Sequence, residues 1–345
     1  MPLIDEDLFA KKIKSDISDN IFMFCGDDDY LKEFYLNKLT GKIVDESLMF
    51  FNFHSYEDDD TPLDVIFADA ENLPVMAEKS CLVVKNYSLD SLKTEEITEF
   101  KDNLKNIPES TVMIFYFSAS KIPTGKNAKW DNITRIFSDM GVVVKIEHRT
   151  PAKTAKLLVS RAKEKGTSID YDTAYYLVTS IGDDMQTVLN EFNKVCAFSC
   201  GEPVTKEMVD MTAVKSIEAS VFDISASIFS GNTDKAFSIV NELLRQKTPV
   251  NSVIGALGSA YVNLYRLKVS LNSEKNVSDF ADSFQYKETR HTFGKIMPFA
   301  KSTKLSAIRK SLDVLLEADT RSKSSKISDE ILLTELVSKL ASLKE

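Results

Sequence analysis

The segment from Phe22 to Tyr35 has the frame of a nucleotide-binding loop but lacks residues that such a loop needs. A strand-like run ends at Phe24, Gly26 supplies a turn, and an amphipathic helix follows, which is where phosphate-loop proteins hold their nucleotide. A working loop reads G-x-x-x-x-G-K-[ST]. Its backbone amides close on the phosphates, its lysine neutralises them and its hydroxyl ligates magnesium. The frame therefore indicates a strand-turn-helix unit at the start of an α/β domain.

The residues that would bind phosphate are missing from this frame. Between Tyr30 and Lys32 the sequence supplies neither the second glycine nor the hydroxyl. Three consecutive aspartates stand where a polyphosphate would lie, and like charges at close range oppose binding. We interpret the segment as a degenerate phosphate loop without a cofactor, made of Gly26, Asp27, Asp28, Asp29 and Lys32. The alternative from these residues alone is an ordinary acidic turn in which one aspartate caps the following helix.

The composition is that of a globular protein with more than one domain. At 345 residues the chain exceeds the usual size of a single hydrophobic core, so two or three domains are expected. No apolar run approaches the ~18 residues of a membrane span, and the first residues are acidic where a secretory signal would be basic. We therefore expect a cytoplasmic protein that makes no contact with a membrane.

Cysteine, histidine and charge usage exclude several kinds of site. Cys196 and Cys200 stand four residues apart, but no cluster of Cys or His completes a tetrahedral metal set, so we expect reduced thiols and no metal. The three histidines are isolated, and we assign them no catalysis. A net charge of −9 argues against autonomous nucleic-acid binding, which depends on clustered Lys and Arg.

Strand-like and helix-like segments alternate up to about residue 147, which predicts an α/β domain with a mainly parallel sheet. The predicted strands are Ile21–Phe24, Met49–Phe53, Cys81–Val84, Val112–Phe117 and Val142–Ile146. The fourth run is continuously apolar, as expected of a strand covered on both faces. It continues into Ser118 without the carboxylates that an ATPase needs there for magnesium and the attacking water.

From about His148 the periodicity is helical only. One helix is predicted over 184–198, a turn over 201–203 and a short helix from Thr205, which together give a small helical unit ending near residue 213. Further helical periodicity covers 221–229, 236–244, 253–267, 308–316 and 331–340. We predict three domains, at residues 1–147, 148–213 and 214–345. The apolar stripe Leu257, Tyr261, Leu264 and Tyr265 is either core or interface.

Four segments carry a resemblance to a known family, in the right order along the chain. They read F-C-G-D-D-D-Y-L-K-E at 24–33, N-L-P-V-M-A-E-K-S-C-L-V-V-K-N at 72–86, I-G-D-D-M-Q-T-V-L-N-E-F-N-K-V at 181–195 and V-F-D-I-S-A-S-I-F-S-G-N-T-D-K-A at 221–236. A fifth, L-L-E-A-D-T-R-S-K at 315–323, fits the last helical hairpin of that family. The chain thereby resembles the δ subunit of the clamp loader of bacterial DNA polymerase III.

The resemblance implies a fold and a set of partners. The first domain would be an AAA+-like parallel-sheet domain without functional nucleotide motifs, the second a small helical lid and the third a helical collar that joins subunits. Such a protein is no enzyme by itself. It binds and opens the ring-shaped sliding clamp, the β subunit, driven by ATP bound to sister subunits. Its further partners would be the γ/τ and δ′ subunits, through the collar, and primed DNA within the assembly.

The resemblance also points to a clamp-binding site. The family grips the clamp with an exposed apolar pair at the end of a helix, and the matching positions are Val75 and Met76, with Leu73 before them. A helix is expected over 62–72, with Ile66, Ala70 and Leu73 on one face and Pro74 as its stop. The family more often has leucine and phenylalanine at the pair. From the residues alone, the alternative is that both side chains pack inside the first domain.

DNA contact is a further expectation from the resemblance. The candidate phosphate contacts are Lys153, Lys156, Arg321, Lys323 and Lys326. Such contacts would carry no sequence information. The alternatives for the whole chain are an AAA+-like scaffold or adaptor subunit of another ATPase assembly, or an ATPase with an unorthodox phosphate site. A δ′ subunit would carry zinc-ligand cysteines and a serine-arginine-cysteine finger, and this chain has neither.

Overall fold

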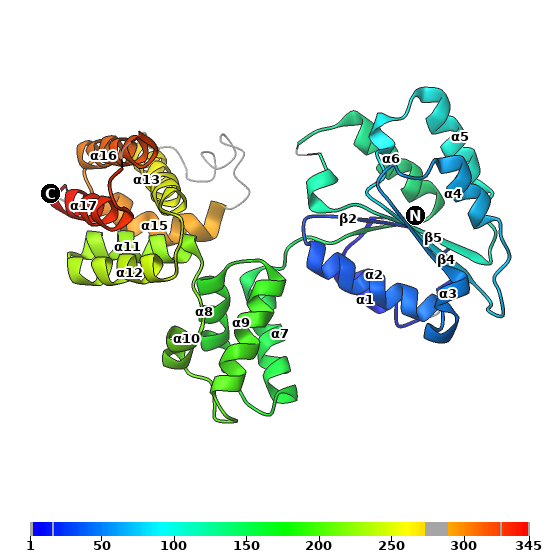
Figure 1. Cartoon of the computed structure of the whole chain (residues 1–345), viewed down its shortest axis with the longest axis horizontal. Helices are drawn as coiled ribbons and strands as arrows, with labels where there is room; N and C mark the ends of the chain where they lie inside the picture. The colour runs from blue at the N-terminus through cyan, green and yellow to red at the C-terminus, as the bar shows by residue number, and fades with distance from the viewer. Residues whose placement is uncertain (1–2, 16, 124, 273–288, 325, 344–345) are drawn as a thin grey trace. The chain divides into compact units, whose positions relative to one another are not determined.

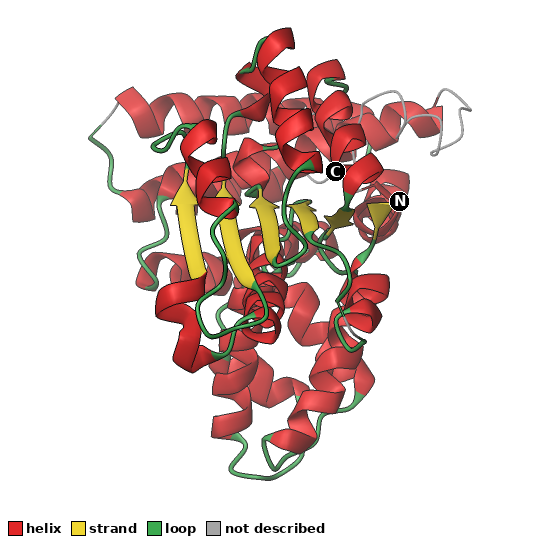
Figure 2. Cartoon of the chain, turned by 90° about the vertical axis from the view of Figure 1, so that its right-hand side faces the viewer, coloured by secondary structure: helices red, strands yellow, loops and turns green. Residues whose placement is uncertain are grey.

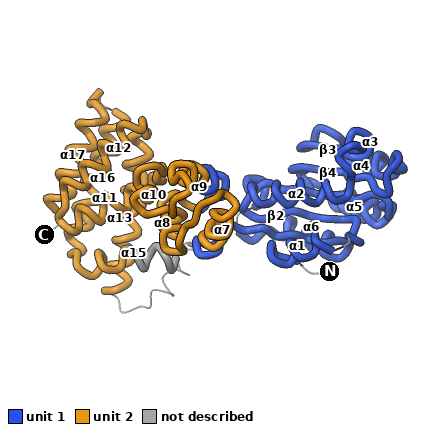
Figure 3. Tube along the Cα trace, turned by 90° about the horizontal axis from the view of Figure 1, so that it is seen from below, with its two compact units in different colours: residues 1–154, 183–190 blue, residues 155–182, 191–345 orange. Residues whose placement is uncertain are grey.

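The computed structural model describes residues 3–15, 17–123, 125–272, 289–324 and 326–343 (Figure 1). The chain forms two compact units, which Figure 3 colours separately. Unit 1 comprises residues 1–154 and 183–190, and unit 2 comprises 155–182 and 191–345. The division into three domains at 147 and 213 stays a prediction.

Unit 1 is built on a six-stranded parallel sheet (Figure 2). Its strands are β1 (Leu3–Ile4), β2 (Ile21–Cys25), β3 (Phe53–Glu57), β4 (Ser80–Lys85), β5 (Thr111–Tyr116) and β6 (Val142–Lys145). Their order in the sheet is β1-β6-β2-β5-β4-β3, and every neighbouring pair is parallel. All six residues of β5 are buried, as its continuous apolar run predicted.

Helices cover both faces of this sheet (Figure 1). They are α1 (Glu6–Lys12), α2 (Asp29–Ile43), α3 (Met49–Asn52), α4 (Leu63–Ala70), α5 (Thr94–Lys105) and α6 (Ala128–Met140), with 3-10 turns at Glu46–Leu48, Leu89–Ser91 and Ala119–Lys121. On one face Phe100 of α5 packs edge-on against Phe115 of β5, with ring centroids 5.5 Å apart. On the other face Phe9 of α1 packs in the same way against Phe24 of β2, at 5.2 Å. Burial of these faces is the main force that holds the layers together.

Four of the five predicted strands are confirmed, and the prediction over Met49–Phe53 is wrong. Residues 49–52 form α3, and strand β3 begins only at Phe53. Asp45 starts the helical turn by accepting a hydrogen bond from the Ser47 amide, and Asn52 donates back to the Leu48 carbonyl. A short apolar run does not distinguish these two structures by itself. Strand β1 was not predicted, because two residues give no periodicity.

The rest of the described chain is helical, apart from an isolated bridge between Ile169 and Val204. Its helices are α7 (Pro151–Glu164), α8 (Tyr171–Ile181), α9 (Met185–Phe198), α10 (Lys206–Thr212), α11 (Ile217–Ser230), α12 (Thr233–Arg245), α13 (Val250–Asn272), α15 (Thr289–Ser302), α16 (Leu305–Ser324) and α17 (Asp329–Ser342). Within the described ranges, none of the helices has the length and hydropathy to cross a membrane. The predicted class, α/β followed by all-α, is confirmed.

Helices α11, α12, α13, α16 and α17 of unit 2 share one hydrophobic core. Leu257, Tyr261 and Leu264 of α13 are buried within the bundle, whereas Tyr265 is only partly buried. The stripe that the sequence left open is therefore core at its first three positions. Helix α11 ends at Gly231, whose φ of +81° gives the left-handed cap that glycine adopts without strain.

Candidate functional site

Gly26 stands at the turn between β2 and α2, where a phosphate loop would begin. Its φ is +113°, and a Cβ added there would lie 1.9 Å from the carbonyl oxygen of Ile146. The Ile146 amide in turn donates to the Cys25 carbonyl oxygen at 2.8 Å. The close approach of the segment after β6 therefore requires glycine at this position, whether or not a phosphate binds.

All three aspartates accept hydrogen bonds from backbone amides, and the donor to Asp29 is the Ala119 amide at 2.9 Å. Asp28 is the N-cap of α2, and its carboxylate accepts a hydrogen bond from the Leu31 amide at 2.8 Å. Its side chain is 2% exposed, and this burial raises the pKa of Asp28 above its ordinary value. Asp27 accepts a hydrogen bond from the His148 amide at 2.8 Å. The turn has the helix-capping arrangement that the sequence offered as the alternative.

Lys32 is fully buried, and its ammonium group is neutralised inside the protein. Nζ donates to the carbonyl oxygens of Gly26 at 2.7 Å and Phe117 at 2.5 Å, and it forms an ion pair with Asp29 at 2.8 Å. It also lies 5.3 Å from the centroid of the Tyr116 ring. Lys32 follows Gly26 by six residues, which is the spacing of the lysine in a phosphate loop. Here carbonyl oxygens at the ends of β2 and β5 bind the ammonium group that would contact phosphate in a working loop.

The second candidate site is the loop between α4 and β4. Leu73, Val75 and Met76 are 81%, 47% and 89% exposed. These side chains do not pack inside unit 1, so the interior alternative does not describe them. Exposed apolar side chains that lie together often mark a surface that binds another protein.

One detail of the expected helix is wrong. Helix α4 ends at Ala70, so Leu73 lies beyond it rather than sharing one helix face with Ile66 and Ala70. The cap is Glu71, whose amide bonds to the Asp69 carbonyl oxygen, so the chain leaves the helix before Pro74 could stop it. The three apolar residues are therefore carried by an irregular loop.

Met76 has a backbone conformation that is uncommon for its type. Its φ is +55°, in the left-handed region that costs a residue with a Cβ roughly 1 kcal/mol or more. Strained backbone of this kind is found disproportionately at functional sites. A side chain that is 89% exposed gains nothing from packing within unit 1 to offset that strain.

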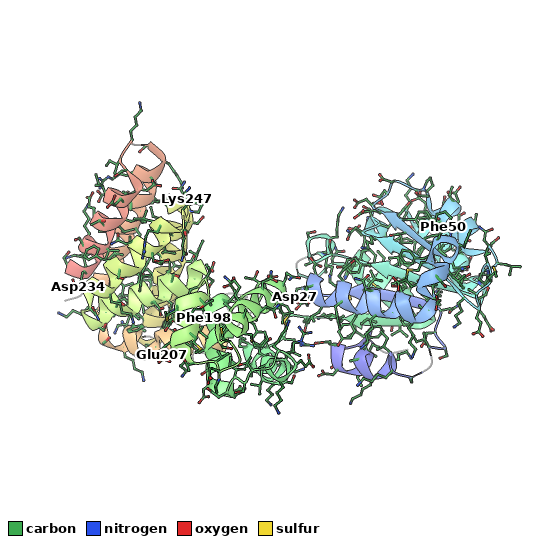
Figure 4. The ribbon with its side chains drawn as sticks, turned by 60° about the horizontal axis from the view of Figure 1, so that its bottom comes forward. Asp27, Phe50, Phe198, Glu207, Asp234 and Lys247 are labelled. Atoms are coloured by element: carbon green, nitrogen blue, oxygen red, sulfur yellow. The ribbon has the colours of Figure 1, made fainter. Side chains whose placement is uncertain are left out.

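Two apolar residues near this loop were missed by sequence reasoning. Phe50 and Phe51 of α3 are 88% and 56% exposed. The only signal was the apolar run Met49–Phe53, which was interpreted as a strand. Figure 4 shows Phe50 on a part of unit 1 separate from Asp27 in the degenerate phosphate loop. The exposed phenylalanines and the degenerate phosphate loop are therefore two distinct sites.

The five predicted DNA contacts are basic side chains on α7, on α16 and just beyond α16. Three of them form ion pairs within their own unit: Lys153 with Asp7 at 2.8 Å, Arg321 with Glu335 at 2.8 Å and Lys323 with Asp319 at 2.7 Å. Lys156 and Lys326 are exposed. The Lys153–Asp7 pair is exposed on both sides, and such surface pairs contribute little to stability.

The cysteines make no disulfide. Cys25 and Cys81 are buried strand residues, and burial raises the pKa of their thiols to about 11 and about 12. Among the described residues no three Cys, His, Asp or Glu side chains are grouped as a metal site. These thiols are therefore protonated core side chains at neutral pH.

Comparisons with known proteins place both ends of the chain in one family. Residues 22–146 match the family model described as DNA polymerase III, delta subunit. Residues 218–340 match the model of the DNA polymerase III delta subunit, C-terminal domain. The second match covers most of the bundle formed by α11 to α17.

A protein sequence and a solved structure from Bacillus subtilis are similar to most of the chain. The DNA polymerase III subunit delta of strain 168 is 21% identical over 258 residues, which is 73% of this chain and 73% of that protein. The solved structure of the B. subtilis DNA clamp loader delta protein matches with a TM-score of 0.65 and 18% identity, over 97% of this chain and 99% of that one. At this identity the structural match shows a shared fold.

Proposed function

The chain belongs to the DNA polymerase III delta subunit family, and from this premise we propose that it is the clamp-loader subunit that binds and opens the sliding clamp. It acts in DNA replication as one part of a hetero-oligomer. The solved B. subtilis relative is named a DNA clamp loader protein, which supports this assignment. We place the protein in the cytoplasm, as expected from the sequence.

The observation that carries the proposal is the exposed loop of Leu73, Val75 and Met76. Full burial of such side chains in a partner's pocket stabilises a complex by roughly 1.5–3 kcal/mol each. A few anchors of this kind dominate the binding energy of most interfaces. Methionine is unbranched and polarisable, and it therefore fits pockets of imperfect shape.

Opening the ring requires more than attachment. A ligand shifts an equilibrium only by the difference between its affinities for the two states. We propose that the loop provides the attachment and that the adjoining surface of unit 1 fits the clamp better when its ring interface is open. The energy for exposing or hiding this surface comes from ATP on sister subunits.

The subunit itself is proposed to bind and hydrolyse no ATP. Lys32 is held by two carbonyl oxygens and Asp29, so a phosphate would have to displace all three contacts. Asp27 and Asp29 would in addition repel it. Equilibrium dialysis with millimolar ATP and Mg²⁺ tests this, and saturable binding would overturn it.

The remaining partners are proposed to bind mainly to unit 2. Leu316 of α16 and Ile331 of α17 are 66% and 60% exposed, and we propose that these apolar residues of the C-terminal bundle contact the γ/τ and δ′ subunits. Contact with primed DNA would use the five basic residues of α7 and the α16 region. Three of them would exchange their present ion-pair partner for a phosphate.

The test is surface plasmon resonance against the sliding clamp of the same organism. The variant Val75→Ser, Met76→Ser should lose at least about tenfold in affinity, which is about 1.4 kcal/mol. A matched control is Val214→Ser, Met211→Ser, which removes a valine and a methionine that are 48% and 76% exposed in unit 2. The control should bind like the wild type.

The outcomes separate the function from the site. If the wild type fails to bind the clamp, the proposed function is wrong. If both double variants bind as the wild type does, the protein is a clamp-binding subunit whose contact lies elsewhere. Equal losses in both variants would indicate a general effect on solubility or folding, which circular dichroism would reveal.

A further inference from the structure

Helix α3 presents two adjacent phenylalanines to solvent. Phe50 is 88% exposed and Phe51 is 56% exposed. Their rings pack edge-on against each other, with centroids 5.1 Å apart and planes at 88°. Aromatic side chains, phenylalanine included, are enriched in protein interfaces relative to the rest of the surface. A soluble chain that exposes two together leaves a large apolar area without a partner.

The residue that follows them ties α3 to the clamp-binding loop. Asn52 is fully buried, and its side-chain amide pairs with both backbone groups of one residue. Its Oδ1 accepts from the Val75 amide at 2.6 Å, and its Nδ2 donates to the Val75 carbonyl oxygen at 2.9 Å. The same Nδ2 lies 3.1 Å from the Leu48 carbonyl oxygen, at the start of α3. One side chain thus fixes the loop relative to the phenylalanines.

A second set of contacts joins the same two segments. The His54 ring has Nδ1 2.7 Å from Oδ2 of Asp69, near the end of α4, and Nε2 3.4 Å from the Phe51 carbonyl oxygen. Asp69 also accepts from the side chains of Tyr56 at 2.5 Å and Asn72 at 3.0 Å. Helix α3, the end of α4 and the loop are therefore held as one preorganised surface, which lowers the entropy that binding costs.

The exposed charges next to this surface are acidic. Asp45 and Glu46 precede α3, and Glu71 and Glu78 lie within the loop region. Lys79 is partly buried, and its ammonium donates to the Ile17 carbonyl oxygen. The surface therefore fits a partner with an apolar pocket and a neutral or basic rim.

We propose that Phe50 and Phe51 are a second anchor for the sliding clamp, continuous with Leu73, Val75 and Met76, and that Asn52 is the positioning residue that keeps the two anchors in register. The proposal rests on the proposed function, because the clamp is the partner of the loop to which α3 is bonded. It adds aromatic area to a grip whose Val75 and Met76 are otherwise modest in size.

The first experiment measures clamp affinity by surface plasmon resonance for Phe50→Ser, Phe51→Ser beside Val75→Ser, Met76→Ser. The matched control is Phe198→Ser, a phenylalanine of unit 2 that is 48% exposed. The α3 variant should lose at least about tenfold in affinity with an unchanged unfolding midpoint, and the control should stay within about twofold. Full affinity in the α3 variant, with loss in the loop variant, overturns this inference and leaves the proposed function standing.

The second experiment tests Asn52 through a double-mutant cycle. Asn52→Ala should weaken clamp binding in the wild-type background but have little further effect once Val75 and Met76 are serine, because the side chains that it positions are gone. Equal effects in both backgrounds would show that Asn52 acts only through general stability. Asn52→Asp keeps the acceptor for the Val75 amide but sets a buried carboxylate against the Val75 and Leu48 carbonyl oxygens, so it should weaken binding at least as much as alanine.

A second copy of the chain is the competing occupant of this surface. Sedimentation equilibrium should give the same mass for the wild type and the Phe50→Ser, Phe51→Ser variant. A dimer that this variant dissociates, together with unchanged clamp affinity, would assign the phenylalanines to self-association and overturn the proposal.

Discussion

Lys32 donates a hydrogen bond from Nζ to the carbonyl oxygen of Gly26, 2.7 Å away, across the turn that a phosphate loop would use. The same ammonium reaches the Phe117 carbonyl oxygen at the end of the neighbouring strand. In parallel α/β sheets, ligands bind outside these carboxyl ends of the strands. In this protein a side chain of the chain itself occupies that position.

Lys32→Met should destabilise unit 1. The substitution keeps the length of the buried stem but leaves two carbonyl oxygens and Asp29 without their donor, which should cost about 3 kcal/mol. Urea unfolding followed by circular dichroism measures the change. Lys38→Met, on an exposed position of the same helix, is the control and should change stability by less than about 0.5 kcal/mol. An equal response in the two variants would contradict the role of Lys32.

Gly26→Ala should destabilise unit 1 by about 3 kcal/mol or more, because the new Cβ meets the backbone of Ile146 and the φ of +113° disfavours any side chain. Gly41 offers a matched control within α2, since a Cβ there has open space. Gly41→Ala should raise stability by about 0.5–1 kcal/mol. Denaturant unfolding should therefore show a loss of stability in Gly26→Ala and a gain in Gly41→Ala, which tests the geometry of the turn.

Met76→Gly should separate the backbone strain at this position from the contribution of the side chain to clamp binding. Glycine adopts the left-handed backbone of this position freely, so the free energy of unfolding should stay the same or rise by up to about 1 kcal/mol. Clamp affinity should fall by about threefold or more, since the exposed side chain is lost. Affinity equal to wild type in the glycine variant would remove Met76 from the proposed site.

Glu335 should make the stability of the C-terminal bundle depend on pH. Its hydrogen bonds to Arg321 and then Lys339 lower the pKa of this carboxylate from the ordinary 4.5 to about 2. The stabilisation is therefore complete above the ordinary value and is lost as pH falls through about 2. Thermal unfolding of Glu335→Gln should show a shallower decline between these two values. The variant Glu202→Gln, at an exposed position in the same unit, should decline as steeply as the wild type.

The sheet of unit 1 follows from the sequence because its strands are short apolar runs between turns. Cys81–Val84 and Val112–Phe117 were located to within one residue at each end. The run from Met49 failed because its helical turn depends on Asn52, whose partner Val75 lies 23 residues further along the chain. No local pattern contains that contact.

The candidate sites, like the sheet, were predicted only in part from the sequence. The absence of a second glycine and a hydroxyl after Gly26 is a property of the sequence, and it was enough to predict that nucleotide does not bind there. The sequence does not show where the Lys32 ammonium goes, because Phe117 is 85 residues away. It likewise does not reveal whether Val75 and Met76 are buried or exposed, since a short apolar loop is compatible with both.

Taken by itself, the sequence determined the class of fold, four of the six strands of the sheet, and the loss of the phosphate-binding residues. These properties depend on periodicity and residue type, which are local. Only the tertiary structure decided that Lys32 is neutralised internally, that α4 ends before Leu73, and that Asn52 ties the helix of Phe50 and Phe51 to the loop of Val75. Each of these depends on contacts between residues distant in sequence, where packing and hydrogen bonding override local preference.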